Sequence, residues 1–502
     1  MSRSPYVARV QSALTLVSAL LLGACAVGPS TRVRPDVPSV TARASSGPSA
    51  DTRQFLDSLR TARAQDGKDS LARITSRLAA ESIDLVASGS SAPAWTEVLR
   101  DSTLESLIRV AVSNNRNLRV AQQRINEFRA LRGVAASRFF PQINVGTTMG
   151  TNKIALAAAP PIEFDAARVT SDLAWELDFW GRTRRATQAA GFDVAAREDD
   201  VRATTLSLVS DVANTYLQLR EADAVITIAE QTLVSREATL QLARRRFEQG
   251  LISELDVRQF EATVADPAAR VADFTRQRTE LENALSVLLG TSPQTITRGQ
   301  LLSDIVKTVN VPDSLSGDLL ARRPDVLRAQ HDFQAATARI GVAQAARLPT
   351  VSITGQYGAQ RPTYGTIFDG RGEIYTLQAG ISVPLFTGGR LSSEQKAAKA
   401  RAEQSRNTFE QVVLVALREA SDAAAGVRLR RDQLAAQQTQ ERALLAAFTI
   451  AERRYASGIS SYLEVLDAQR GLFAAQLTRV QVERQYLAAT VQLFRAVGGG
   501  WQ

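Results

Sequence analysis

The sequence predicts a mainly α-helical protein with strands for a membrane β-barrel, built from two tandem copies of one structural unit. The duplication is visible in the segments 245–250 and 453–458, whose closing glycines are 208 positions apart (458 less 250). Pro141 and Pro349 are separated by the same offset. An offset that stays constant without gaps indicates a structural repeat. Long stretches rich in Ala, Leu, Arg and Gln predict helices, and shorter alternating stretches predict strands.

The composition argues against several classes of function. The net charge of +9 comes from 60 Lys and Arg residues against 51 Asp and Glu residues. These charges are interspersed along helical patterns, as on solvated helix faces, which argues against nucleic-acid binding. No glycine-rich phosphate loop with lysine is present. The single histidine, His331, has no cysteine or second histidine near it, so we expect a surface or packing residue. We therefore predict no enzyme activity, no metal site and no cofactor.

Residues 1–24 are predicted to be a lipoprotein signal peptide. Arg3 and Arg9 precede an apolar run over 10–22 and a segment of small residues. Residues 22–25 resemble the bacterial lipoprotein box, which predicts a covalent lipid on Cys25, and Ala26 favours the outer membrane over retention at the inner one. An ordinary signal peptide that happens to contain a cysteine is the alternative. Residues 25–94 are interpreted as a lipid-anchored tether, because Ser, Pro and Gly are frequent there.

The first repeat is assigned to residues 95–300. A helical pattern runs from about Thr103 to Arg138 and ends before Pro141. Alternating residues from Gln142 predict a first strand, and a loop is expected at 159–161, which contains two prolines. A second alternating strand follows, and the second repeat, residues 315–502 after a linker at 301–314, has the same order. The apolar residues predicted for the barrel strands are Trp175, Leu177, Phe179, Ile381, Val383 and Leu385.

After each strand pair the chain is expected to form a helical hairpin. From Arg182 to Glu248 the pattern contains no proline, and a continuous helix of that length would extend roughly 100 Å. Such a rod cannot fold into a compact domain alone and must lie beside other rods. A returning helix is expected from Gly250 to about Leu289, with a kink at Pro267.

Four strands per chain cannot close a membrane barrel. The two open edges would be unsatisfied in lipid, and four is below the usual minimum of about eight strands. Three chains would supply twelve strands, and cyclic symmetry would close the ring. The sequence therefore predicts a homotrimer in which a β-barrel continues into a tube of helices, an α-barrel.

Several segments together resemble the outer membrane efflux protein family, the TolC-like channels, and in particular its lipid-anchored subgroup. They are Cys25–Pro29, Trp95 with Asp101, Leu285–Gly290, Phe386–Arg390 and Ala496–Trp501. The stretch from about 45 to 92 is longer and less regular than that family's pattern. The resemblance implies a lipid-anchored outer membrane trimer that extends into the periplasm. Its partners would be outer membrane lipid, a periplasmic membrane fusion (adaptor) protein and an inner membrane pump of the RND type.

The resemblance also implies functional residues at the hairpin ends. Tyr455, Glu464 and Asp467 resemble the residues that hold and line the constriction, and Asp256 resembles their partner in the first repeat. Independently, Glu464 and Asp467 are three positions apart on one helix face, and threefold symmetry would make them an acidic ring. A solvated helix face is the alternative. The residues predicted at the adaptor-docking tips are Arg246, Gly250, Leu251, Arg454, Gly458 and Ile459.

Other functions remain open at this level. A channel for type I protein secretion would share the architecture. A periplasmic coiled-coil lipoprotein without a pore would show a sustained seven-residue apolar repeat and no amphipathic strand pairs. An adaptor protein would carry compact β-domains beside its helical hairpin. The alternating strands favour a passive channel that exports small molecules such as drugs and toxic organics.

Overall fold

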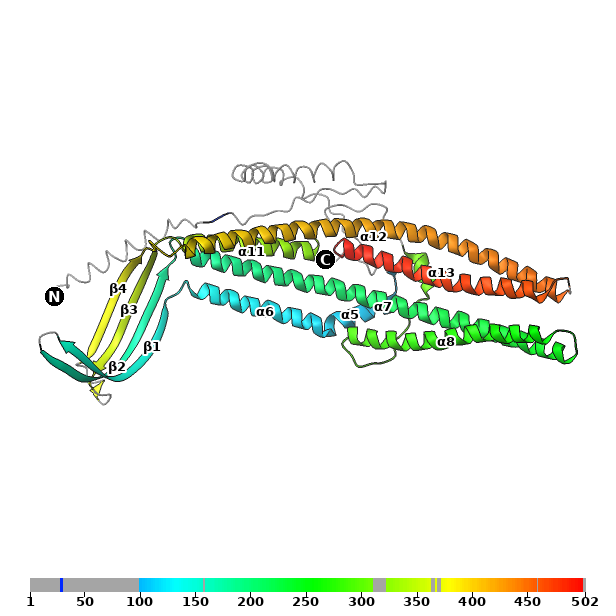
Figure 1. Cartoon of the computed structure of the whole chain (residues 1–502), viewed down its shortest axis with the longest axis horizontal. Helices are drawn as coiled ribbons and strands as arrows, with labels where there is room; N and C mark the ends of the chain where they lie inside the picture. The colour runs from blue at the N-terminus through cyan, green and yellow to red at the C-terminus, as the bar shows by residue number, and fades with distance from the viewer. Residues whose placement is uncertain are drawn as a thin grey trace, which may run out of the picture. The chain divides into compact units, whose positions relative to one another are not determined.

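The computed structural model describes residues 28–29, 99–156, 159–309, 322–362, 366–367, 372–457 and 459–499 (Figure 1). The predicted signal peptide, Cys25, nearly all of the tether, Trp95 and Gly458 lie outside the described residues. Within the described part of the chain, no helix is both long and apolar enough to cross a membrane. The described residues divide into two units, one containing 28–29, 123–199 and 328–411, the other containing 99–122, 200–327 and 412–499.

The first unit contains one antiparallel sheet of four strands in the order β1-β2-β3-β4 (Figure 1). Its strands are β1 (Gln142–Leu156), β2 (Ala159–Leu177), β3 (Thr350–Arg361) and β4 (Glu373–Ser382). Strands from both repeats therefore form one sheet, because β2 of the first repeat pairs with β3 of the second. Among the described residues, β1 and β4 are the two edge strands.

The register gives the sheet one apolar and one polar face. Directly paired residues share a face, and one such row reads Ile143, Leu173, Gly355, Leu377, while another contains Trp175, Ile353 and Ala379. The adjacent row on the opposite face reads Asn144, Asp172, Gln356, Thr376. In that row the Gln356 amide donates to Asp172 Oδ1 at 2.8 Å. The predicted alternation of apolar and polar residues is confirmed for these strands.

The predicted loop at 159–161 is wrong, because these residues begin β2. Both prolines fall where the β1–β2 register shifts, between the pairs Ile154–Ile162 and Leu156–Ala159. A proline lacks an N–H and is tolerated in a sheet at strand starts and irregularities. Reading proline as a loop signal was therefore misleading at this position.

Three predicted strand residues lie beyond the strand ends. Phe179 follows the end of β2, because the Asp178 carboxylate accepts from the Thr183 and Arg184 amides at 3.0 and 2.8 Å and the chain turns into a helix. Val383 and Leu385 follow the end of β4 at Ser382. They flank Pro384, which cannot donate to a strand ladder. Trp175, Leu177 and Ile381 lie within strands.

The helices confirm the two repeats. Their bounds are α6 (Arg116–Ser137) and α11 (Pro324–Ala345) with 22 residues each, α7 (Arg182–Glu248) and α12 (Arg390–Ala456) with 67 each, and α8 (Glu254–Leu288) and α13 (Tyr462–Ala496) with 35 each. Each of these second-repeat helices begins 208 positions after its counterpart, as in 390 less 182. The rod predicted from Arg182 to Glu248 is thus one helix, and each rod is followed by a shorter returning helix (Figure 1).

The helix predicted over 103–138 is two helices, α5 (Ser102–Asn114) and α6. Asn115 separates them, because its Oδ1 accepts from the Asn117 and Leu118 amides at 2.9 and 3.1 Å, an N-cap for α6. Its Nδ2 donates to Leu288 O at 3.0 Å and fixes the break against α8. The predicted linker also contains a short helix, α9 (Leu302–Thr308), which buries Leu302 and Ile305.

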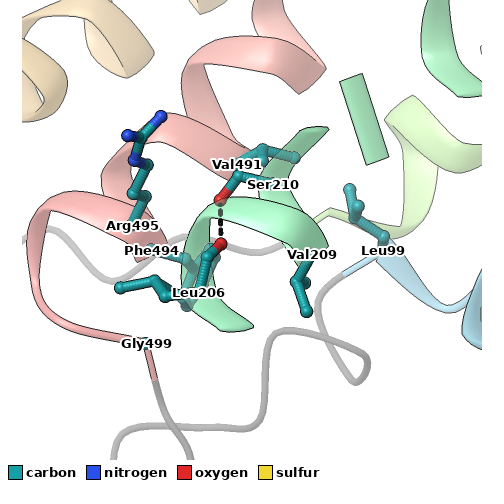
Figure 2. Close-up of a pocket in the computed structure, with 8 residues that line it drawn as sticks. All are labelled: Leu99, Leu206, Val209, Ser210, Val491, Phe494, Arg495 and Gly499. Carbon is teal, nitrogen blue, oxygen red and sulfur yellow. Dashed lines mark hydrogen bonds between the residues drawn. The ribbon is translucent and has the colours of Figure 1, made fainter. Parts of the chain in front are cut away.

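The core of the second unit lies around α5, α7, α8, α9, α12 and α13. Tyr216 of α7 is fully buried; its hydroxyl donates to Asp101 Oδ2 at 3.0 Å and accepts from the Gly299 amide at 2.9 Å. Asp101 also caps α5 through the Thr103 amide. Figure 2 shows a small apolar pocket between α7 and α13, lined by Leu206, Phe494 and neighbours. It encloses about 10 Å³, no more than the least that a single water requires, so we interpret it as a packing gap.

Candidate gate and docking tips

The two hairpin tips have the same backbone construction. The Leu251 amide donates to Arg246 O and the Ile459 amide donates to Arg454 O, each at 2.9 Å. This bond closes a Schellman-type helix end, which needs a residue with positive φ, and Gly250 supplies it at +72°. Leu251 and Ile459 are 67% and 71% exposed. The structure therefore places the described tip residues together at each turn and leaves two apolar side chains open to solvent.

Asp256 and Glu464 are equivalent positions with different contacts. The Asp256 carboxylate accepts from the Ser253 amide at 2.9 Å, and the Ser253 hydroxyl accepts from the Asp256 amide at 3.3 Å. This capping box holds the start of α8. Glu464 forms no such box; its Oε2 lies 3.9 Å from Arg454 Nη2, and both side chains are half-exposed. The contacts of Asp256 are thus with Ser253 of its own turn, and its role as the first-repeat partner of Tyr455, Glu464 and Asp467 stays a prediction.

Tyr455 is instead bound to Arg246. The Arg246 Nη1 donates to the Tyr455 hydroxyl at 2.6 Å, and the guanidinium carbon lies 5.3 Å from the centre of the tyrosine ring. Tyr455 also meets Tyr462 edge-on at 5.3 Å, and Tyr462 packs on Phe260 of α8 at 3.9 Å. Burial raises the pKa of the Tyr462 phenol. These contacts join the two hairpins near their tips, and they engage Arg246, one of the residues predicted for adaptor docking.

Glu464 and Asp467 lie on one exposed face of α13. Both are exposed, while the intervening Val465 and Leu466 are buried. A pair of acids three residues apart on an open helix face is what an acidic ring requires of each chain. The acidic ring, with an ordinary solvated face as its alternative, therefore stays a prediction.

A further contact near the tip was not found from the sequence. Pro267 lies inside α8 and has no N–H, so the carbonyl of Thr263, four residues earlier, lacks its helical donor. Arg236 of α7 supplies one, because its Nη1 donates to Thr263 O at 2.6 Å. Arg236 is 2% exposed, its guanidinium carbon lies 5.1 Å from the Phe473 ring centre, and burial lowers its pKa. Its ion-pair partner is distant, since Asp266 Oδ2 is 3.8 Å away.

The internal repeat supports this interpretation of Arg236. The positions equivalent to Arg236 and Pro267 in the second repeat are Leu444 and Ala475. The arginine and the proline thus occur together in one copy and are both replaced in the other. Aligning the two halves residue by residue would have revealed this pair from sequence, because a proline inside a helix predicts an unpaired carbonyl one turn earlier.

Among the described residues, no group of three or more His, Cys, Asp or Glu side chains is placed to hold a metal ion. His331 lies with its Nδ1 2.7 Å from Asp199 Oδ2 and its ring beside Phe192. It therefore has a packing environment in the first unit.

Comparison with known proteins assigns the family. The family model described as outer membrane efflux protein matches residues 107–291 and again 315–499, one match per repeat. The chain belongs to this family. It is accordingly an outer membrane protein with two copies of the family's repeat, whose described residues include the four strands of the sheet.

Relatives of known name agree with this assignment. The toluene efflux pump outer membrane protein TtgC of Pseudomonas putida is 33% identical over 81% of this chain and 85% of its own length. The cation efflux system protein CusC of Escherichia coli O157:H7 is 30% identical over 81% and 88%. The solved structure of the outer-membrane channel OprN has a TM-score of 0.76 and 30% identity, over 81% of this chain and 92% of that one.

Proposed function

We propose that this chain is the outer membrane channel of a tripartite efflux pump, a passive conduit formed by three copies. One observation supports the proposal most strongly. The chain combines two long helical rods with a sheet that has too few strands to close into a barrel by itself. In the part of the chain that the structure describes, the sheet has an apolar face and two unpaired edges, β1 and β4. With an even number of antiparallel strands, β4 of one copy can pair antiparallel with β1 of the next. Three copies would supply twelve strands, within the range of membrane barrels.

Exposed apolar residues at the two hairpin tips support a proposal about the protein partners. Leu251 and Leu255 on one tip have exposed counterparts in Ile459 and Leu463 on the other, at 63–71% exposure. Exposed apolar residues grouped at repeated positions are typical of an interaction surface. We propose that a periplasmic adaptor protein binds there and links the channel to an inner membrane pump of the RND type. That pump would supply the energy, since the channel itself is proposed to carry out no chemistry.

Cys25 is proposed to carry a covalent lipid that anchors the mature chain to the outer membrane. The support is sequence-based: Cys25 is the single cysteine and it follows an apolar signal segment.

For cargo we propose small organic molecules, in keeping with the toluene pump relative. The function is tested by complementation: the chain, expressed with a cognate adaptor and pump in a strain lacking its own channel, should restore resistance to dyes, detergents and antibiotics. No recovery with any compound, or recovery of protein secretion only, would contradict the proposal.

Neutralising the proposed acidic ring should open the channel to ions. We expect Glu464→Ala with Asp467→Ala to raise single-channel conductance about twofold or more and to weaken block by divalent cations. The reason is that a ring of like charges in a narrow pore attracts and holds cations. Planar bilayer recordings measure both effects. The charge-retaining pair Glu464→Asp with Asp467→Glu is the control and should keep the cation block. Parent-like block in the alanine pair would contradict the ring.

A bulky residue at the first tip should impair export. Gly250 has φ +72° and open space around its Cβ position, so Gly250→Leu costs about 1–2 kcal/mol of backbone strain and causes no clash. We expect the loss of docking to reduce drug resistance at least fourfold while the assembly stays intact. Gly388→Leu is the matched control, because Gly388 has φ +59° and equally open surroundings but lies before α12. Equal resistance in the two variants would argue against docking at this tip.

A further inference from the structure

Gly28 makes an unusually close contact inside the first unit. A Cβ built on Gly28 would lie 2.8 Å from the Cα of Gly341, closer than Cβ atoms approach other atoms. Its φ of +137° is also in the region that favours glycine. The Arg185 Nη2 donates to Gly28 O at 3.3 Å, and its Nη1 is held by Gln188 at 2.9 Å. The backbone at position 28 is thus seated between α11 and α7.

The seat is close to the base of the sheet. Gly341 precedes the start of β3 by nine positions (350 less 341), and Arg185 follows the end of β2 by eight (185 less 177). These strand ends are adjacent, because Leu177 pairs with Val351. Gly341 therefore lies on the helix just before β3, and Arg185 lies on the helix just after the neighbouring strand β2.

Among the described residues, the seat has no counterpart at the positions that the repeat relates to it. The glycine equivalent to Gly341 is Gly133, and nothing lies within 4 Å of its Cβ position. The residue equivalent to Arg185 is Ser393, whose short side chain cannot reach as a guanidinium does. The contact thus distinguishes the otherwise equivalent entry helices α6 and α11.

We propose that Gly28 is the point at which the lipid-anchored start of the chain is fixed to the protein, in the seat formed by Gly341 and Arg185. This rests on the proposed lipidation of Cys25. Cys25 is three residues from Gly28, so its Cα lies within about 11 Å of Gly28 Cα. The seat therefore holds the lipid beside the base of the sheet, where the sheet's apolar face meets the membrane. A single acyl chain binds membranes only marginally. Fixing the start of the chain to the protein gives the lipid anchor a defined place on each chain.

Photo-cross-linking in native membranes tests the seat. A benzophenone amino acid introduced at Ser30 in the full-length protein should cross-link to a peptide from α11 or from the first turns of α7, identified by mass spectrometry. Gly341→Leu and Arg185→Ala should each reduce this cross-link at least fivefold. Gly133→Leu adds the same side chain to the equivalent glycine, where there is room, and should leave the yield unchanged.

Each outcome decides a separate part of the proposal. Cross-links to other segments only, or an equal loss in Gly133→Leu and Gly341→Leu, would overturn the seat. Arg185→Ala tests it without adding volume to a helix, in case Gly341→Leu fails to fold. The mass of the N-terminal peptide reports the lipid on Cys25 independently. A cross-link to α11 in a chain without lipid would keep the seat and overturn its anchoring role, whatever the channel transports.

Discussion

Replacing Arg236 by Leu should destabilise the α7–α8 hairpin by about 2 kcal/mol more in the parent chain than in a Pro267→Ala chain. In the parent, the substitution leaves the buried Thr263 carbonyl without a donor, which costs about 1–3 kcal/mol. In the Pro267→Ala chain, the backbone N–H restored at position 267 supplies that donor, and Arg236 becomes dispensable for it. Hydrogen exchange of the amides following Thr263 measures the difference, expected as a roughly 30-fold contrast in exchange rate between the two backgrounds.

The second repeat provides a reciprocal control. Ala475→Pro alone should disrupt α13, at a cost of about 3 kcal/mol, because the Gly471 carbonyl loses its helical donor. Leu444 already lies beside Gly471, with its Cδ2 3.4 Å from that residue's Cβ position. Adding Leu444→Arg should therefore recover part of the loss. Equal effects of Arg236→Leu in both backgrounds, together with no recovery by Leu444→Arg, would contradict the assigned role.

Removing the bond between Arg246 and Tyr455 should open the tip. Arg246→Ala deletes both the 2.6 Å hydrogen bond and the contact with the ring, whereas Tyr455→Phe deletes only the bond. A charge-assisted hydrogen bond contributes about 1.5–3 kcal/mol. Its loss should therefore shift the equilibrium between the closed and the open tip at least about tenfold per chain. In a trimer the effect would be multiplied across three chains. We expect a much higher open probability in planar bilayers, larger for Arg246→Ala than for Tyr455→Phe.

Arg245→Ala is the control for this prediction. It removes the same charge one residue away, but Arg245 is exposed and its Nε donates only to Gln241 O of its own helix, at 3.4 Å. Parent-like recordings are expected for Arg245→Ala. Parent-like recordings for Arg246→Ala, or an equally open channel for Arg245→Ala, would show that net charge and not this bond governs the tip.

Much of the helical fold could be predicted because its signals are local. The absence of proline from Arg182 to Glu248 predicted a single helix with those ends, and glycine punctuation predicted both hairpins. The break at Asn115 escaped prediction because an asparagine within an amphipathic pattern carries no strong stop signal, and its capping role depends on a contact with α8. The end of β4 was readable in principle, since Pro384 cannot continue a ladder.

The site was predictable in position but not in contacts. The repeat predicts which residues lie at the two hairpin tips. Helical geometry places Glu464 and Asp467 on one face. The partner of Tyr455 could not be read the same way, because Arg246 is 209 positions away and periodicity does not specify how two hairpins align. The capping role of Asp256 was available from its spacing to Ser253, a pattern that marks helix starts.

We expect this chain, which has too few strands to enclose a pore alone, to enclose one together with identical neighbours. Native mass spectrometry of the purified full-length protein, released from lipid nanodiscs, tests it most directly. A mass of three chains as the dominant species is predicted. A stable single chain in the nanodisc as the only species would contradict the account.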